Sequence, residues 1–280
     1  MPFSPAIPLT GLAGFRFLEQ TQDRQRAVFD RSPDLQREID YFLKRAPEIT
    51  SAAELVGDRR ALAVVLGAFG LDEDINKGAF IRKVLEEGTL DRRAFANRLV
   101  EPAYREMSAF LGFGDTGGLL AFENTRLNLV DRYRERQFEL AVGEVDLDMR
   151  LALNFKREAA AIAEGSPAGD TGWLRMLGSP PLRQVLESAL VLPSEFALID
   201  LDQQVAEIAS RAERIFGVED PTDLRDSSVV DAMVDRFLVR QQALNGAASA
   251  TTRGSVALSL LSAGGLGTAA QSNLFASNFL

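Results

Sequence analysis

The apolar residues along this chain are spaced as they are in α-helices. Across residues 201–216 and again across 229–238, apolar side chains recur at intervals of three or four residues. This spacing places them on one face of a helix, and that face must pack against a partner surface. The alternation of apolar and polar residues that marks a half-buried strand is nearly absent. The pattern therefore predicts an all-α, multihelical fold.

Capping signals divide this pattern into roughly a dozen helices or helical turns. The predicted starts are a serine or aspartate directly before proline, or a serine followed three residues later by glutamate. The starts are Ser32, Ser51, Ser179 and Asp220, and the predicted stops are Gly70, Gly88, Gly112 and Gly217.

Two parts of the chain resemble each other. The segment DLQREIDYF (34–42) aligns with DMRLALNFK (148–156), and VLGAFGLDEDI, which starts at Val65, aligns with VLESALVLPSEF, which starts at Val185. The second copy carries a few extra residues, which the loop at 164–172 can hold. The resemblance predicts two related helical halves with a shared core, since a solenoid would need at least three units.

A helix at 118–142, about 37 Å long at 1.5 Å per residue, is expected to join the two halves. The predicted organisation has a first helical half (1–116), a linking helix with the second half (117–244) and an apolar C-terminal segment (245–280). That last segment has no charged residue from Gly254 onward.

The composition removes several classes of chemistry. The 280 residues include no cysteine and no histidine, which excludes disulfides, thiolate chemistry and every site built on imidazole. The hydrophobic share of 46% and the charged share of 25% are those of an ordinary globular protein. Any enzyme built on this chain would have to use carboxylates, lysine, tyrosine or an activated serine.

The formal net charge of −9 argues against binding to nucleic acids and to membrane surfaces. Arginines cluster at Arg132, Arg134 and Arg136, but the acids Asp131, Glu135 and Glu139 lie among them. We interpret this stretch as a solvated helix face.

The N-terminal residues lack the pattern of a secretory signal, and no window reaches the roughly 20 apolar residues of a membrane span. We expect a cytoplasmic protein, with export left open. The sequence does not give the oligomeric state.

The stretch LDEDINKG (71–78) has the spacing of a calcium loop in its first positions, where Asp72, Asp74 and Asn76 stand. The position that needs glycine is Lys77, and the position that needs a bidentate glutamate is Lys83. We therefore interpret the stretch as a helix stop and restart, with its acids at the positive end of the following helix.

The segment GFGDTG (112–117) matches the letters of a dinucleotide-binding fingerprint. That motif works only between a parallel strand and a helix, and here a predicted helix precedes it, so we expect a helix–helix connection. Trp173 follows a glycine-containing loop and starts an apolar helix, which favours a role in the core.

Paired carboxylates are the remaining route to catalysis. Asp146 with Asp148, and Asp200 with Asp202, are two residues apart and would point in different directions on a helix, so helix capping is the favoured role. The sequence supports no catalytic residue, no cofactor and no metal site.

The end of the chain is unusual because it carries large apolar side chains without charges. Leu274, Phe275, Phe279 and Leu280 would invite aggregation if they stayed exposed, so they are the candidate partner-binding residues. Residues 255–263 are expected to dock on the protein's own core, and docking of the last ten residues on the core or on another subunit stays open.

Several runs resemble a bacterial family, domain of unknown function twelve-seventeen. The most specific are LGAFGL (66–71) and the downstream FANRL (95–99), and the resemblance covers most of residues 9–242. It implies a multihelical fold and, for many members, genes that lie among flagellar genes. It implies no catalytic or binding residues.

The leading expectation is a non-enzymatic helical protein that binds other proteins, or itself, in flagellar assembly or function. The first alternative is a carboxylate enzyme with a cleft between the halves, which converging acids with perturbed pKa values would favour. The second is a cytoplasmic export chaperone for flagellar subunits, which would need an exposed apolar groove.

Overall fold

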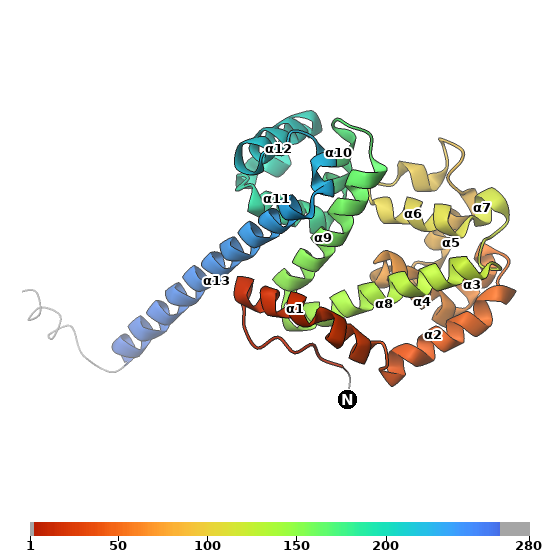
Figure 1. Ribbon diagram of the computed structural model, residues 1–280, viewed down its shortest axis with the longest axis horizontal. Coiled ribbons are helices and arrows are strands. Elements are labelled where there is room, and N and C mark those ends of the chain that lie inside the picture. Colours follow the sequence, from red (N-terminus) through yellow and green to blue (C-terminus); the bar gives the residue numbers. More distant parts are fainter. Residues whose placement is uncertain (1–2, 264–280) are drawn as a thin grey trace, which may run out of the picture.

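The fold is all-α, as the apolar spacing predicts. A computed structural model describes residues 3–263, with side-chain surroundings for residues up to 246, and this part contains no strand (Figure 1). The first half holds α1 (Gly11–Phe29), α2 (Pro33–Arg45), α3 (Ala52–Gly57), α4 (Arg59–Phe69), α5 (Gly78–Glu87), α6 (Pro102–Leu111) and α7 (Phe113–Thr116). The second half holds α8 (Glu123–Val145), α9 (Leu147–Gly165), α10 (Thr171–Gly178), α11 (Pro180–Ala189), α12 (Leu201–Phe216) and α13 (Ser227–Ala263).

Short 3-10 helices join some of these elements. They are η1 (Ala46–Glu48), η2 (Asp72–Asn76), η3 (Phe95–Arg98), η4 (Ser194–Leu198) and η5 (Pro221–Arg225).

The order of elements repeats along the chain. The series α2, α3, α4, η2, α5, η3, α6 returns as α9, α10, α11, η4, α12, η5, α13, apart from the additional turn η1. The packing partners repeat as well, because α2 packs on α4 as α9 does on α11, and α3 on α5 as α10 does on α12. The aligned segments 34–42 and 148–156 lie in α2 and α9, so the repeat seen in the sequence corresponds to a repeat of structure.

The helix that leads each half crosses to the other half. The first helix, α1, packs on α9 and α13, whereas α8 packs on α2 and α4 as well as on its own neighbour α9 (Figure 1). One continuous hydrophobic core runs through both halves and includes Phe42, Phe138, Phe155 and Phe237. The halves therefore form one packed body. None of the helices within 3–263 has the length and hydropathy of a bilayer-crossing segment.

The predicted apolar faces are buried or half-buried with one exception. Val205 and Ile208 on α12 are in the core, and Trp173 is 1% exposed, as expected. Leu201, by contrast, is 52% exposed. It is the first residue of α12, and the helix covers the core only from its second turn.

The linking helix begins later and ends later than predicted, since α8 spans Glu123–Val145 rather than 118–142. Gly117 and Gly118 adopt φ values of 83° and 98°, which belong to turns and not to a right-handed helix. The Asp146 side chain accepts a hydrogen bond from the Met149 amide at 3.1 Å, so it caps α9 and ends the link.

At the C-terminal end, α13 runs from Ser227 to Ala263, and the predicted boundary at residue 245 lies inside it. Leu238 is the last buried residue on α13 among those with described side chains. The candidate partner-binding residues Leu274, Phe275, Phe279 and Leu280 lie outside the described residues, as do the side chains of 255–263.

Candidate functional site between the two halves

The acidic stretch after α4 uses its side chains to hold other helices in place. The Asp72 carboxylate accepts a hydrogen bond from the Gln137 amide at 3.1 Å, and Asn76 Oδ1 accepts one from Arg59 at 3.0 Å. Asp74 is buried, accepts a hydrogen bond from the Tyr104 hydroxyl and pairs with Lys77 at 2.6 Å. The oxygens that a calcium ion would need are thus directed to separate partners.

The position of these acids differs from the prediction. They occupy η2, and α5 begins only at Gly78, so they lie at the start of a 3-10 helix rather than at the start of α5. No group of three or more acidic side chains suited to a metal ion occurs among the described residues.

The GFGDTG segment connects two helices, as predicted. Gly112 ends α6 in the left-handed conformation, and residues 113–116 form the short α7. The Asp115 carboxylate accepts hydrogen bonds from the Thr89 amide at 2.9 Å and the Leu90 amide at 3.2 Å. Burial raises the pKa of Asp115, but these hydrogen bonds outweigh it and hold the pKa below its usual value. The segment therefore ties α7 to the loop after α5.

The two predicted carboxylate pairs lie at helix starts. Asp146 caps α9, with Asp148 in the same first turn, and Asp200 precedes α12, with Asp202 in its first turn. The Asp200 side chain makes no capping hydrogen bond. The two pairs lie on different helices, α9 and α12.

The least exposed charged side chain among the described residues lies between α8 and α9. Glu139 on α8 is 3% exposed, and its two carboxylate oxygens accept hydrogen bonds from Arg157 on α9 at 2.8 and 2.9 Å. Glu158 accepts hydrogen bonds from Arg136 and, at 2.6 Å, from Arg157. We call Arg136, Glu139, Arg157 and Glu158 the inner ion network.

This network corrects one sequence interpretation. The arginine-rich face of α8 was expected to be solvated throughout, yet the Arg136 side chain is only 20% exposed. Burial and the neighbouring Arg157 lower the pKa of Arg136. For Arg157 burial also lowers the pKa, but the hydrogen bonds to Glu139 outweigh it and raise the pKa overall.

Two further acids on the first half face this network. Glu101 precedes α6 and Glu106 lies on it, and burial raises the pKa of both, with the negative charge of Glu158 adding to the shift. By its accessible surface Glu106 is exposed, so the direction of its pKa shift rests on the surrounding side chains and on the nearby Glu158 charge. Sequence reasoning missed both residues, because nothing in their spacing shows that α6 faces α9.

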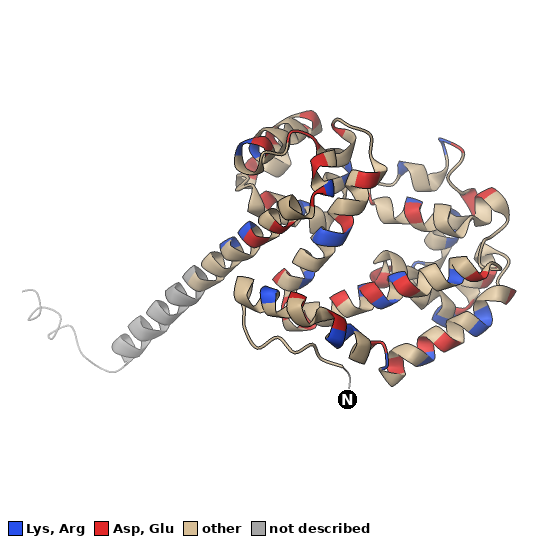
Figure 2. Ribbon diagram, viewed as in Figure 1, with Lys and Arg blue, Asp and Glu red and all other residues tan. Residues whose placement is uncertain are grey.

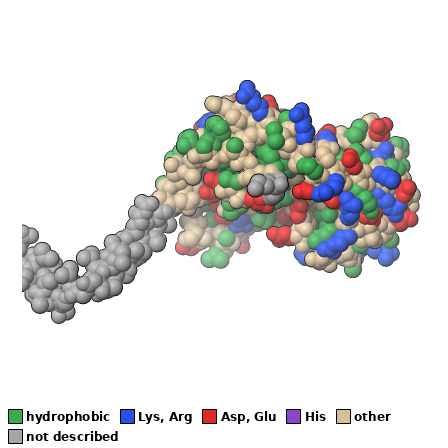
Figure 3. All heavy atoms as spheres, turned by 90° about the horizontal axis from the view of Figure 1, so that it is seen from below, with side chains coloured by type: hydrophobic (Ala, Val, Ile, Leu, Met, Phe, Trp, Pro, Cys, Tyr) green, Lys and Arg blue, Asp and Glu red, His purple; other side chains and the backbone are tan. Residues whose placement is uncertain are grey.

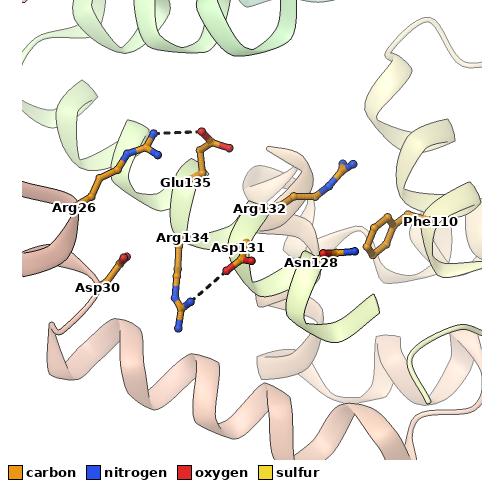
Figure 4. A pocket seen from close by; sticks show the side chains of 8 residues that line it. All are labelled: Arg26, Asp30, Phe110, Asn128, Asp131, Arg132, Arg134 and Glu135. Carbon is orange, nitrogen blue, oxygen red and sulfur yellow. Dashed lines mark hydrogen bonds and ion pairs between the residues drawn. The ribbon is translucent and has the colours of Figure 1, made fainter. Parts of the chain in front are cut away.

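An open hollow of about 500 Å³ runs along α8 (Figure 4). Its walls come from α1, α6 and α8. Its charged groups are partly paired, since Arg26 contacts Glu135 and Arg134 contacts Asp131, each at 3.3 Å. The Arg132 guanidinium stacks over Phe110 at 5.1 Å and Phe69 at 5.5 Å. Figure 2 shows acids and bases interspersed along α8.

The arrangement suits a recognition surface better than a reaction centre. The hollow has polar walls and paired charges, so it offers complementary contacts to a polar surface. Of the features described here, the raised pKa values of Glu101 and Glu106 are the one that would suit a general acid.

The comparisons with known proteins bear on family and fold. A family model described as a protein of unknown function (DUF1217) matches residues 68–229, which is more than half of the chain. The crystal structure of protein AGR_C_984 from Agrobacterium tumefaciens is similar, with a TM-score of 0.71 and 28% sequence identity. The match covers 87% of this chain and 100% of that one. No curated protein matches the sequence.

Proposed function

The chain belongs to the DUF1217 family of proteins of unknown function, and from its surface chemistry we propose that it is a non-enzymatic protein that binds other proteins. Its place of action in this proposal is the bacterial flagellum or its assembly. The flagellar part rests on the gene context of the family that the sequence resembles.

The observation that carries the binding role is the distribution of charged and apolar side chains. The inner ion network joins its own acids and bases, for example Glu139 with Arg157, which leaves few free groups for catalysis between the halves. Large aliphatic side chains stay exposed on the body, such as Leu198 at 83% and Val100 at 85%. Residues 254–280 add a charge-free segment with four large apolar side chains near its end. Apolar side chains that lose contact with water when a partner packs against them would contribute to binding, which supports this role.

Deletion of the gene tests the proposal. We expect a strain that lacks the protein to swim poorly or to carry fewer flagella, and a plasmid copy to restore both. Normal swimming with a normal number of filaments would remove the flagellar assignment.

A carboxylate enzyme is the second candidate, and the raised pKa values of Glu101 and Glu106 favour it. The two roles differ in what they require of these side chains. An enzyme would lose its function in Glu106→Gln, whereas a binding protein would keep it. The export-chaperone alternative would need an apolar groove, and the hollow along α8 is lined mainly by charged residues.

A further inference from the structure

Exposed aliphatic side chains gather where α13 leaves the body. They come from the segment before α1, the end of α8, the start of α9 and α13 itself, and they are Leu9 (53% exposed), Val145 (46%), Leu147 (55%) and Leu244 (53%). We call these four residues the collar. In the view from below, hydrophobic side chains lie beside the start of the α13 extension (Figure 3).

Contacts made by residues next to the collar bring the four segments close together. Asn245, next to Leu244, donates a hydrogen bond to Asp148, next to Leu147, at 3.4 Å. Gly11, two residues after Leu9, lies against the Gln242 side chain on α13. The collar is therefore one surface built from both halves.

Over residues 239–246, α13 leaves the core of the body. From residue 239 to 246 none of its side chains is buried, and the helix continues to Ala263. At 1.5 Å per residue, the 25 residues after Leu238 extend about 37 Å. A helix rich in serine, threonine and glycine is only marginally stable on its own in water, so packing against a partner would stabilise this extension.

The charges indicate which partner fits. The chain carries −9 overall, yet residues 239–280 contain no acid and two bases, Arg240 and Arg253. Two acids, Asp146 and Asp148, flank Leu147 at the start of α9. Within the described residues, no ion pair joins either acid to a base. Burial and the nearby Asp146 raise the pKa of Asp148. The acids beside the collar and the bases of the helix extension have opposite charges, so they complement each other between two copies.

We propose that the collar receives the α13 extension of a second copy, with Arg253 of that copy meeting Asp148. The exchange is reciprocal, because each copy offers both the collar and the extension, and such a contact closes as a two-fold dimer. The proposal deepens the proposed binding role by naming a second copy of this chain as one partner.

Sedimentation of the purified full-length chain over a range of concentrations tests this. We expect a species of twice the 30.6 kDa chain mass. Leu147→Lys places a cation in the collar and should weaken dimerisation at least tenfold. The matched control is Leu90→Lys, which changes an equally apolar side chain that is 79% exposed elsewhere, and it should leave the dimer intact.

A charge exchange gives the sharper test. Asp148→Arg and Arg253→Asp should each reduce dimerisation, and the double variant should restore most of it. Thermal melting of each variant identifies any that fails to fold. A monomeric wild-type chain, or a double variant no better than the single variants, would overturn the proposal. The dimer and the flagellar role can fail separately. A chain that is monomeric in sedimentation but restores swimming contradicts the dimer and leaves the flagellar role intact.

Discussion

Gly70 at the end of α4 and Val191 at the end of α11 occupy the same position in the two halves. Each is followed by a leucine whose amide donates a 2.9 Å hydrogen bond back into the last turn, from Leu71 to Leu66 and from Leu192 to Glu187. Their φ values are 72° and 56°. This turn suits glycine, which has no Cβ, and strains a β-branched residue.

The strain predicts that Val191→Gly stabilises the protein. Removal of a Cβ from the left-handed region should raise the free energy of unfolding by about 1 kcal/mol. Urea unfolding followed by circular dichroism measures the change. The control is Val191→Ala, which keeps a Cβ in the strained position and should give no gain. If alanine stabilised as much as glycine, the strain at Val191 would not be the cause.

The reverse change at the equivalent position should be costly. In Gly70→Val, a Cβ with the same left-handed φ would also lie 3.1 Å from Nη1 of Arg136, which belongs to the inner ion network. We expect the free energy of unfolding to fall by about 2 kcal/mol or more. A midpoint of urea unfolding unchanged from wild type would contradict this expectation.

Breaking the ion pair between Glu139 and Arg157 should destabilise the protein strongly, whereas replacing both residues with apolar ones should destabilise it little. Arg157→Met leaves Glu139 buried without its bidentate partner, which should cost about 3–5 kcal/mol of unfolding free energy. The double variant Arg157→Met with Glu139→Leu removes both charges and should recover most of that loss. Glu158 also loses a contact, so the recovery is measured against Glu139→Leu alone. A double variant as unstable as Arg157→Met would show that the cost does not come from an unpaired buried acid.

Asp115 should matter for stability although no chemistry depends on it. Asp115→Ala removes an ionised acceptor from the Thr89 and Leu90 amides and should cost about 1–3 kcal/mol. Because its folded-state pKa is depressed, its contribution is present at neutral pH and is lost as the pH falls below the usual aspartate range. The difference in unfolding free energy between wild type and Asp115→Ala should therefore become smaller in acid. A difference in unfolding free energy that did not change with pH would mean that Asp115 stabilises the fold by packing and not by its charge.

Glu106 should show the opposite pH dependence. Its pKa is raised in the folded state, so the folded chain holds its proton to higher pH than the unfolded chain does. The wild type therefore loses stability relative to Glu106→Gln as the pH rises from the usual glutamate range through the folded pKa. Thermal melting across this range measures the difference, with Glu86→Gln on α5 as the control. A variant less stable than wild type at neutral pH would contradict the burial argument.

The sequence was sufficient for the all-α class, the repeat and most helix starts and stops, because these depend on local spacing and capping. The sequence was not sufficient to predict which side chains of a helix are buried, because tertiary packing decides this. Arg136 and Asp131 belong to the same charged stretch, but α9 covers the side of α8 that carries Arg136 and leaves the Asp131 side chain 71% exposed. In the sequence Leu201 belongs to the apolar stripe of α12, but in the structure it lies before the part of that stripe that packs on the core.

The candidate site was less predictable for the same reason. Glu101 and Glu106 are far from Glu158 along the chain, and only the packing of the two halves brings the Glu158 charge close enough to raise their pKa values. The signal that could have revealed the inner network is the pairing of Arg136 with Glu139 three residues later on one helix face. That spacing also occurs on many solvated helices, so it becomes informative only with the position of α9.

The central claim is that this chain acts by binding proteins at the flagellum and not by catalysis. Swimming speed and filament number in a deletion strain test it when the strain is complemented with three forms at equal levels. Full-length protein and Glu106→Gln should restore both, whereas residues 1–253 should not, because they lack the charge-free segment. Restoration by residues 1–253 together with failure of Glu106→Gln would contradict the account and favour an enzyme.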